Sequence, residues 1–341
     1  MDWTLVPAKQ LAALAPHWDA LQERTLPHAF LRSEFLICLL DQFGQGKELL
    51  AYRKEGAEWA AALVVQPEGK GRWNSFQPSQ LPLGPVLMPK SGLNEASLQS
   101  LLRALPGVAL TVGLTQLDSL AFPGPFEHAR LRHQHYIDTA WVDIETSFEV
   151  YWEARGKNLR QNTRKQLKKV EATGVKPRLE MIEAPESVAT AIEQYGVLES
   201  SGWKAEAGTA ISQDSAQGRF YREAMERAAS AGHARIYRYW FDDEVVAMDL
   251  CVHQDDCLVI LKTAYQQAHQ AVSPSTLMRA EEFKLLFDEG RFKRIEFFGR
   301  VMEWHTRWTE NSRHLFHLTA YRWGWLKELL DWTNRSKTRK A

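Results

Sequence analysis

The sequence predicts an α/β protein with mixed sheets, arranged as two tandem domains. Three observations lead to this prediction. Short apolar runs alternate with segments of helical periodicity, the hydrophobic share is 45%, and 341 residues are enough for about two domains. Both halves follow the order helix, helix, hairpin, strand, helix, strand, although no sequence repeat is visible. We expect a first domain over 1–140, a second over 141–332 and a basic, disordered tail over 333–341.

The first half begins with two predicted helices. Leu11, Leu14, Trp18 and Leu21 share one helical face, and Ser33 suits the N-cap of the next helix. The remaining predicted elements are a hairpin over 48–66, an irregular proline-containing surface loop over 77–89, a helix after Asn94, and strands at 108–114 and 135–143.

The second half begins with a predicted long helix near Ser147. It is followed by a strand at 178–182, a helix at 187–200, a loop from Gly202, a helix after Asp214, a hairpin over 234–252, a late strand at 316–321 and a last helix around Trp325.

Residues 258–299 form one predicted unit of strand, loop, helix and strand. Ser273 and Pro274 suit the N-cap and first turn of the helix, Gly290 suits its end, and 295–298 suit the second strand. A helix that begins just after a strand presents unpaired N–H groups and a positive dipole end, which can hold a phosphate or a developing oxyanion. The alternative is an ordinary crossover that binds no ligand.

The overall composition excludes several classes of protein. Lys+Arg and Asp+Glu are both 42, so no global field attracts nucleic acid or an anionic membrane. The three cysteines have neither metal-like spacing nor an obvious disulfide framework, which fits a reducing compartment. We see no signal region after Met1 and no apolar run near the roughly 20 residues that a membrane span needs. We therefore expect a soluble cytoplasmic protein; nothing in the sequence indicates its oligomeric state.

A basic stripe follows one predicted helix. Lys157, Arg160, Arg164 and Lys168 are spaced by three, four and four residues, so they share a face. The stripe is either a solvated helix face or an anion site for a cofactor phosphate, a nucleic-acid backbone or an acidic glycan. Aromatic residues do not interleave with these charges, so base stacking is not indicated.

Three segments together resemble a known family. They are Lys-Asn-Leu-Arg with Arg-Lys at 157–165, Ser-Gly-Trp-Lys with Gly-Thr-Ala at 201–210, and Lys-Thr-Ala-Tyr with Ser-Pro at 262–274. In this order, within residues 145–310, they resemble the acetyltransferase-like domain of the CelD/BcsL group, in the FemAB-like branch of the GNAT superfamily.

This resemblance implies two GNAT-like domains, the first degenerate, and an N-acyltransferase. Acetyl-CoA or a longer acyl-CoA would donate the acyl group to an amine, with an amino sugar or other glycan precursor of polysaccharide biosynthesis as acceptor. FemAB relatives use aminoacyl-tRNA, so an aminoacyl transferase whose basic helix meets tRNA is the alternative. A third hypothesis is a non-catalytic GNAT-fold binding protein.

Two residues depart from the family pattern and bear on catalysis. Ser275 replaces the glycine of the usual Ser-Pro-Gly, and His305 stands where a lysine is usual. Amide formation needs a neutral amine, donors for the oxyanion and a proton for the leaving group. By superfamily analogy we expect backbone N–H groups near 261–263 to bind the oxyanion. We expect His305, or else Glu303, to act as the base and Tyr265 to protonate a leaving thiolate. The alternatives are a hydrogen-bonded structural histidine and a packed tyrosine.

The remaining candidates are assigned to the donor and to the acceptor. For the donor we expect Lys262, Thr263, Ser273, Ser275 and Thr276. For the acceptor we expect Trp203, Lys204, Lys157, Arg160, Arg164 and Arg300. The histidine pairs lack cysteine or carboxylate neighbours at metal-like spacing, so we predict no metal. Walker A and Gly-x-Ser-x-Gly motifs are absent.

Overall fold

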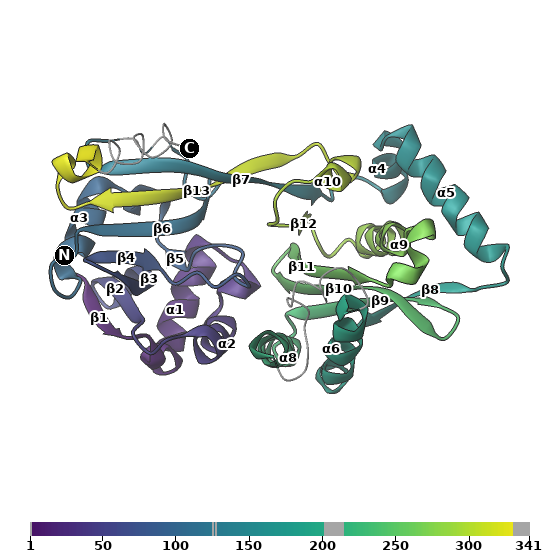
Figure 1. Cartoon of the computed structure of the whole chain (residues 1–341), viewed down its shortest axis with the longest axis horizontal. Coiled ribbons are helices and arrows are strands. Elements are labelled where there is room, and N and C mark those ends of the chain that lie inside the picture. Colours follow the sequence, from purple (N-terminus) through teal and green to yellow (C-terminus); the bar gives the residue numbers. More distant parts are fainter. Residues whose placement is uncertain (1, 125, 127, 201–214, 330–341) are drawn as a thin grey trace, which may run out of the picture. The chain divides into compact units, whose positions relative to one another are not determined.

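The chain divides into two compact units. The computed structural model describes residues 2–124, 126, 128–200 and 215–329. Unit 1 comprises Met1–Asp138 and Arg313–Ala341, and unit 2 comprises Thr139–Ser312 (Figure 1). The first change of unit lies close to the predicted boundary at 140. Residues 313–332, expected in the second domain, fall in unit 1 because the strand β13 (Ser312–Tyr321) pairs there with β6 (Thr111–Asp118).

Unit 1 is a mixed sheet with helices, as the predicted fold class requires. Its strands run in the order β1-β2-β3-β4-β6-β13, and all these neighbours are antiparallel except β4 and β6. Besides β6 and β13, its elements are β1 (Thr4–Pro7), α1 (Leu11–Thr25), α2 (Ser33–Phe43), β2 (Leu49–Glu55), β3 (Glu58–Gly69), β4 (Arg72–Ser75), β5 (Val86–Leu87), α3 (Glu95–Ala104), the first part of β7 (Leu131–Asp143), and the short 3-10 turns η1 (Ala8–Gln10), η2 (Ala29–Leu31) and η3 (Lys90–Gly92).

The proline-containing segment 77–89 differs from its prediction as an irregular surface loop. Leu81 and Leu83 are buried, and β5 pairs with β3 inside the unit. The sequence pattern does not show this burial, because the apolar residues stand between prolines and have no period of two. This segment is therefore part of the core of unit 1.

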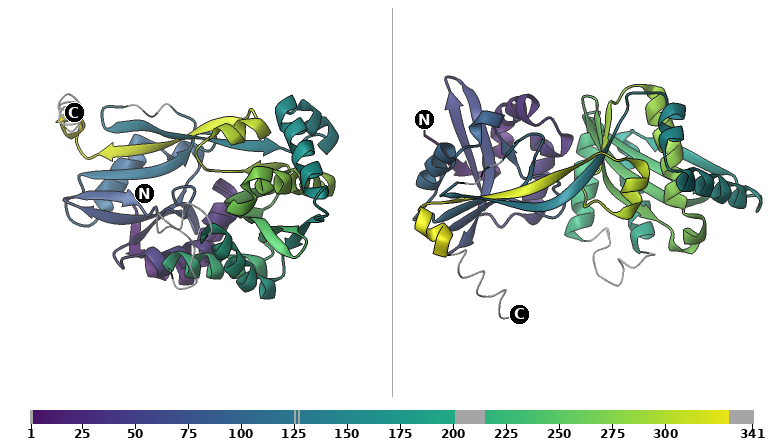
Figure 2. Two further views of the ribbon diagram at one scale, coloured as in Figure 1. Left: turned by 45° about the vertical axis from the view of Figure 1, so that its right-hand side comes forward. Right: turned by 90° about the horizontal axis from the view of Figure 1, so that it is seen from above.

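Unit 2 is a second mixed sheet, with helices on both faces (Figures 1 and 2). Its strand order is β7-β12-β11-β10-β9-β8, and only β11 and β12 are parallel. Besides the end of β7, its elements are α4 (Phe148–Ala154), α5 (Lys157–Glu171), β8 (Pro177–Ile182), α6 (Pro185–Ser200), α8 (Ala216–Ser230), β9 (Ala234–Phe241), β10 (Glu244–Gln254), β11 (Cys257–Tyr265), the 3-10 helix η4 (Gln267–Val272), α9 (Pro274–Glu289), β12 (Arg294–Glu296) and α10 (Glu303–Trp308).

The single long helix expected after Ser147 is two helices, so that prediction was wrong. Ser147 caps α4 by accepting a hydrogen bond from the Val150 N–H. The chain then becomes extended at Arg155 and Gly156, and α5 begins at Lys157. Glycine is a poor helix former, which explains why the helix is interrupted at this point.

The crossover β11–α9–β12 confirms the predicted strand–helix–strand unit. Helix α9 begins at Pro274 and ends at Gly290, whose φ of 62° is the left-handed value that glycine tolerates. Ser273 is the N-cap residue, as predicted, but its φ is 48° and its side chain makes no capping bond. Instead its Oγ accepts a hydrogen bond from Gln166 Nε2 at 3.1 Å, a partner over 100 residues earlier in the chain.

The parallel strands β11 and β12 separate soon after they meet. They pair only from Cys257 to Val259, whereas β11 continues to Tyr265. The later part of β11 therefore lacks β12 as a neighbour, while β10 still pairs along its other edge. This opening lies beside the first turn of α9 and positions the site described below.

Within the described ranges, none of the helices has both the length and the apolar character needed to cross a bilayer.

Candidate functional site

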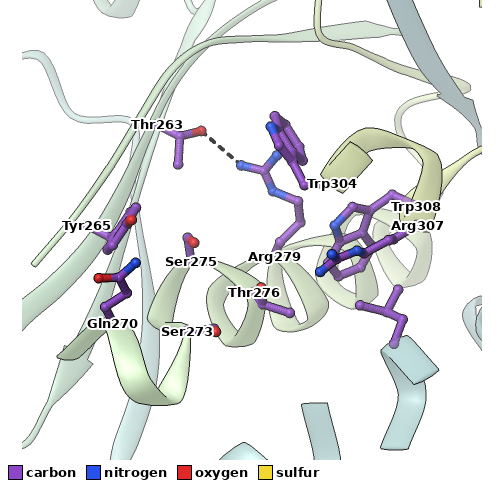
Figure 3. A pocket seen from close by; sticks show the side chains of 11 residues that line it. Thr263, Tyr265, Gln270, Ser273, Ser275, Thr276, Arg279, Trp304, Arg307 and Trp308 are labelled. Atoms are coloured by element: carbon purple, nitrogen blue, oxygen red, sulfur yellow. Dashed lines mark hydrogen bonds between the residues drawn. The ribbon is translucent and has the colours of Figure 1, made fainter. Parts of the chain in front are cut away.

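A cavity of about 430 Å³ lies in unit 2, where β11 extends past β12 (Figure 3). Four elements build most of its wall: the end of β11, the turn η4, the first two turns of α9, and α10. Its lining residues are Leu159, Thr263, Tyr265, Gln270, Ser273, Ser275, Thr276, Arg279, Trp304, Arg307 and Trp308. Hydroxyl groups, indole rings and two guanidinium groups thus share one hollow, which suits a polar ligand with an apolar portion.

Four of the five predicted donor residues line this cavity. They are Thr263, Ser273, Ser275 and Thr276. The fifth, Lys262, is not among the lining residues, because successive side chains of a strand point to opposite faces. Its Nζ lies 2.9 Å from Glu199 Oε1, near the rings of Tyr195 and Tyr221, which belong to the helices α6 and α8. Lys262 therefore stabilises the opposite face of the sheet.

Two of the three predicted catalytic residues lie at the cavities. Tyr265 lines the first cavity, with its side chain beside Gln270 in Figure 3. Glu303 lines an adjoining cavity of about 440 Å³, and its Oε1 accepts a hydrogen bond of 2.7 Å from Arg307. Arg307 lines both cavities, so the two hollows are neighbours.

The third predicted catalytic residue, His305, is buried and lines neither cavity. Its Nδ1 accepts a hydrogen bond from the Met302 N–H at 2.9 Å, and its ring stacks on Trp304. Burial, with the charge of Arg279, lowers the pKa of His305 to about 4. The imidazole is therefore neutral near pH 7 and carries its proton on Nε2. This arrangement suits a hydrogen-bonded structural histidine, the alternative to a catalytic base.

The predicted basic stripe of α5 lines neither cavity. The residues of α5 that do so, Asn158, Leu159, Asn162 and Gln166, are neutral. Lys157 and Arg164 are exposed, and the spacing of 3.6 residues per turn places them on a different side of the helix from these lining residues. The half-buried Arg160 donates a hydrogen bond from Nε to the Arg155 carbonyl at 3.1 Å. The structure therefore does not bring the stripe to the cavities.

Three further predicted acceptor residues are not brought to the cavities by the described structure. Arg300 is exposed and lines neither of them. Trp203 and Lys204 lie outside the described residues.

Arg279 is the main site residue that the sequence interpretation missed. Its side chain rises from α9 to the cavity, only 3% of the residue is exposed, and it forms an ion pair with the buried Asp249 of β10. The same nitrogen, Nη2, donates to Thr263 Oγ1 at 3.0 Å, and the guanidinium lies 5.2 Å from the Trp304 ring centre (Figure 3). One sequence signal was available: Asp249 is a single acid in the apolar run Val-Val-Ala-Met-Asp-Leu-Cys-Val, and a buried carboxylate needs a partner.

A second carboxyl group lies behind this ion pair. Glu282 is buried on α9, and its burial together with the Asp249 carboxylate raises the pKa of Glu282 well above the usual value. The raised pKa favours the protonated form of Glu282, which can donate to Asp249. Arg279 and Asp249 then carry the two opposite charges of this cluster.

Across the described parts of both units, no group of three or more histidine, cysteine, aspartate or glutamate side chains is arranged to hold a metal ion.

Comparisons with known proteins agree with this fold. The model of the Acetyltransferase (GNAT) domain matches residues 157–314. Among solved structures, the C-terminal domain of a protein described as a lysylphosphatidylglycerol synthetase from Agrobacterium fabrum has a TM-score of 0.59 and 12% identity, over 91% of this chain and 92% of that one. FemX has a TM-score of 0.58 and 9% identity, over 94% and 97%, and L-PGS from Bacillus licheniformis 0.52 and 16%, over 89% and 91%.

No curated protein matches the chain in sequence. At these identities the structural similarities establish the fold alone. Residues 157–314, which include all but one of the residues that line the two cavities, therefore match the model of an acetyltransferase (GNAT) domain, in a chain whose mixed α/β fold is similar to those of FemX and the synthetase domain.

Proposed function

We propose that this protein is an N-acyltransferase that moves an acyl group from acyl-CoA to an amine acceptor. The observation that carries the proposal is the opening between β11 and β12 beside the first turn of α9, within the region matched by the GNAT domain. The exposed strand edge and the helix start offer backbone hydrogen bonds to a long, thin donor.

The donor's pantetheine arm would lie along the unpaired edge of β11. Its amide groups can take the place of a neighbouring strand, since β12 pairs with β11 only as far as Val259 and does not cover the edge from Ile260 to Tyr265. The start of α9 is suited to the phosphates, through its backbone N–H groups and the hydroxyls of Ser275 and Thr276. A register shift in the β10–β11 pairing leaves Leu261 as an extra residue, and its irregular backbone is our candidate for the oxyanion site.

The proposed reaction uses few side chains. The amine nitrogen attacks the thioester carbon, the C–S bond breaks, and an amide forms. Tyr265 would donate a proton to the leaving thiolate, and Glu303, directly or through water, would take the proton that the amine releases. His305 would act as a neutral acceptor that positions the start of α10, through the hydrogen bond that its Nδ1 accepts from the Met302 N–H.

The acceptor we favour is an amino sugar or another glycan precursor. Trp304 and Trp308 offer indole faces to the apolar side of a sugar ring, and five hydroxyl-bearing side chains line the same cavity. These hydroxyls can both donate to and accept from sugar hydroxyls.

Exposed cations on α5 favour a second candidate, an aminoacyl-tRNA-dependent transferase. Lys157, Arg164 and Lys168 lie on a helix whose opposite part reaches both cavities, so a phosphate backbone could follow the stripe. Against this candidate, the exposed cations of the stripe line neither cavity.

Thermal-shift measurements on the full chain separate the candidates. Acetyl-CoA at 100 times its Kd should stabilise the protein by about 2.7 kcal/mol, whereas tRNA should have little effect at physiological salt. A stabilisation by tRNA alone, with steep salt dependence, would favour the second candidate. If neither ligand shifts the melting temperature, the transferase proposal fails.

A further inference from the structure

Arg279 lines the first cavity, and one of its guanidinium nitrogens is buried without a hydrogen-bond partner in the described structure. In the described structure, Nη2 of Arg279 donates hydrogen bonds to Asp249 and Thr263, whereas its buried Nη1 makes no hydrogen bond. A buried N–H group without an acceptor is costly, and more so on a charged group. A ligand that brought an oxygen to Nη1 would remove this cost.

The surroundings hold the guanidinium in place. The Asp249 carboxylate fixes one side, and the rings of Phe297 and Trp304 lie 5.6 and 5.2 Å from the guanidinium carbon. Only 3% of Arg279 is exposed, so the side chain cannot move into solvent without leaving Asp249 unpaired. Its remaining N–H groups are therefore presented in a fixed direction.

The charge balance indicates which kind of oxygen fits. Asp249 already compensates the charge of Arg279 in an ion pair between two buried side chains. A carboxylate or phosphate at Nη1 would add an uncompensated negative charge to a buried cluster, whereas a carbonyl oxygen would satisfy the N–H groups without changing the net charge.

We propose that Arg279 is a positioning residue that binds a carbonyl oxygen of the acyl-CoA donor through Nη1. The assignment rests on the proposed function. The location of Arg279 supports this role. It lies four residues after Ser275 on α9, so the two side chains share a helix face. Its partner Thr263 lies on the part of β11 that extends past the pairing with β12. The carbonyl would belong to a pantetheine amide or to the thioester itself.

The test measures dissociation constants by titration calorimetry for three probes. CoA carries the pantetheine amides, acetyl-CoA adds the thioester carbonyl, and adenosine 3′,5′-bisphosphate lacks the pantetheine arm. The variants are Arg279→Met and the double variant Arg279→Met with Asp249→Asn, in which no buried carboxylate is left unpaired and folding is better preserved. The control is Lys284→Met, which removes an exposed cation from the same helix outside the cavities.

The expected result is about a tenfold loss of acetyl-CoA affinity in both Arg279 variants, with the bisphosphate unaffected and Lys284→Met like the wild type. An equal loss for CoA identifies a pantetheine amide, and an unchanged CoA affinity identifies the thioester carbonyl. A merely structural role would weaken all three probes together.

Two results would overturn the proposal while leaving the proposed function intact. One is acetyl-CoA binding as tight in the double variant as in the wild type, and the other is an equal loss for the bisphosphate. If the wild-type protein binds neither CoA nor acetyl-CoA, the proposed function itself fails, and this assignment fails with it.

Discussion

Each unit contains one parallel strand pair joined by a crossover, but among the described residues the place where the strands part is a cavity in unit 2 and is packed in unit 1. In unit 2, β11 continues for six residues past its pairing with β12, and Thr263 and Tyr265 of this extension line the first cavity. In unit 1, β4 pairs with β6 over Arg72–Asn74 and ends one residue later; a cavity of about 560 Å³ lies beside Arg72, Asn74 and Thr111 of the paired part.

The corresponding place in unit 1 is filled by the chain itself. The Ser75 and Thr115 hydroxyls lie 2.7 Å apart, and the Thr115 hydroxyl donates to Gln77 Oε1 at 3.1 Å. The Gly84 N–H donates to the Gln116 carbonyl, and a Cβ on Gly84 would lie only 2.2 Å from the Thr115 oxygen. The segment 76–88 is thus packed against β6 at the place where these two strands part.

This difference assigns the two crossovers different roles. The same strand–helix–strand arrangement is a packed core in unit 1 and a candidate donor site in unit 2. A crossover therefore becomes a site only when its strands diverge and no segment of the chain fills the opening. The expectation of a degenerate first domain agrees with this packing and stays a prediction.

The largest effect should come from breaking a buried ion pair, and one such pair is chosen from each unit. Asp249→Ala leaves Arg279 unpaired in unit 2, and Asp118→Ala leaves Arg313 without its buried carboxylate in unit 1. Each change should lower the free energy of unfolding by about 3–5 kcal/mol, measured by guanidinium denaturation. Of the two, only Asp249→Ala should also weaken acetyl-CoA binding. Equal weakening by both would show that stability alone explains the loss.

Filling the hollow of unit 2 should abolish donor binding. Ser275→Trp places an indole at the start of α9, as the segment 76–88 fills unit 1. We expect the Kd for acetyl-CoA to rise about 100-fold or more, a change near 2.7 kcal/mol, without loss of folding. The control is Ser91→Trp, at an exposed position of unit 1. Unchanged binding in Ser275→Trp would place the donor elsewhere.

The pH dependence of stability should report the burial of His305. Its pKa is about 4 in the folded protein and about 6.5 when unfolded, so between these values the unfolded state binds more protons. The free energy of unfolding therefore falls as the pH falls from 6.5 towards 4. His305→Gln should make the free energy of unfolding depend less steeply on pH, by the equivalent of up to one bound proton. Denaturation series at several pH values between 4 and 6.5 measure this slope. An identical slope in both proteins would contradict the burial described here.

The smallest effect should come from the basic stripe. Arg164 is exposed and lines neither cavity, so Arg164→Glu should change the Kd for acetyl-CoA less than about twofold at 0.15 M salt, where exposed charges are screened. Titration calorimetry of the same variant with tRNA compares the two candidate donors directly. A large loss of tRNA binding, with acetyl-CoA unaffected, would revive the aminoacyl-tRNA candidate.

Local patterns in the sequence predicted the elements that build the site. The apolar run before Lys262, Pro274 at the helix start and Gly290 at its end specify β11 and α9, because strand burial, helix initiation and helix termination are local effects. Asn94 likewise caps α3, as expected, by accepting from the Ser97 N–H.

The parts that failed depend on distant partners. The ion pair of Asp249 with Arg279 joins residues 30 apart, and the bond of Gln166 to Ser273 joins residues 107 apart. The place of β13 in unit 1 depends on pairing with β6, about 200 residues earlier. No local pattern encodes such contacts, which is why the sequence interpretation overlooked Arg279.

Hydrogen–deuterium exchange with and without acetyl-CoA tests the central claim most directly, because it reads both crossovers in one experiment. The account predicts slower exchange in peptides covering 260–265 and 275–279 of unit 2, and no change over 72–88 of unit 1. Protection in the unit 1 crossover, or none in the unit 2 crossover while acetyl-CoA is bound, would contradict it.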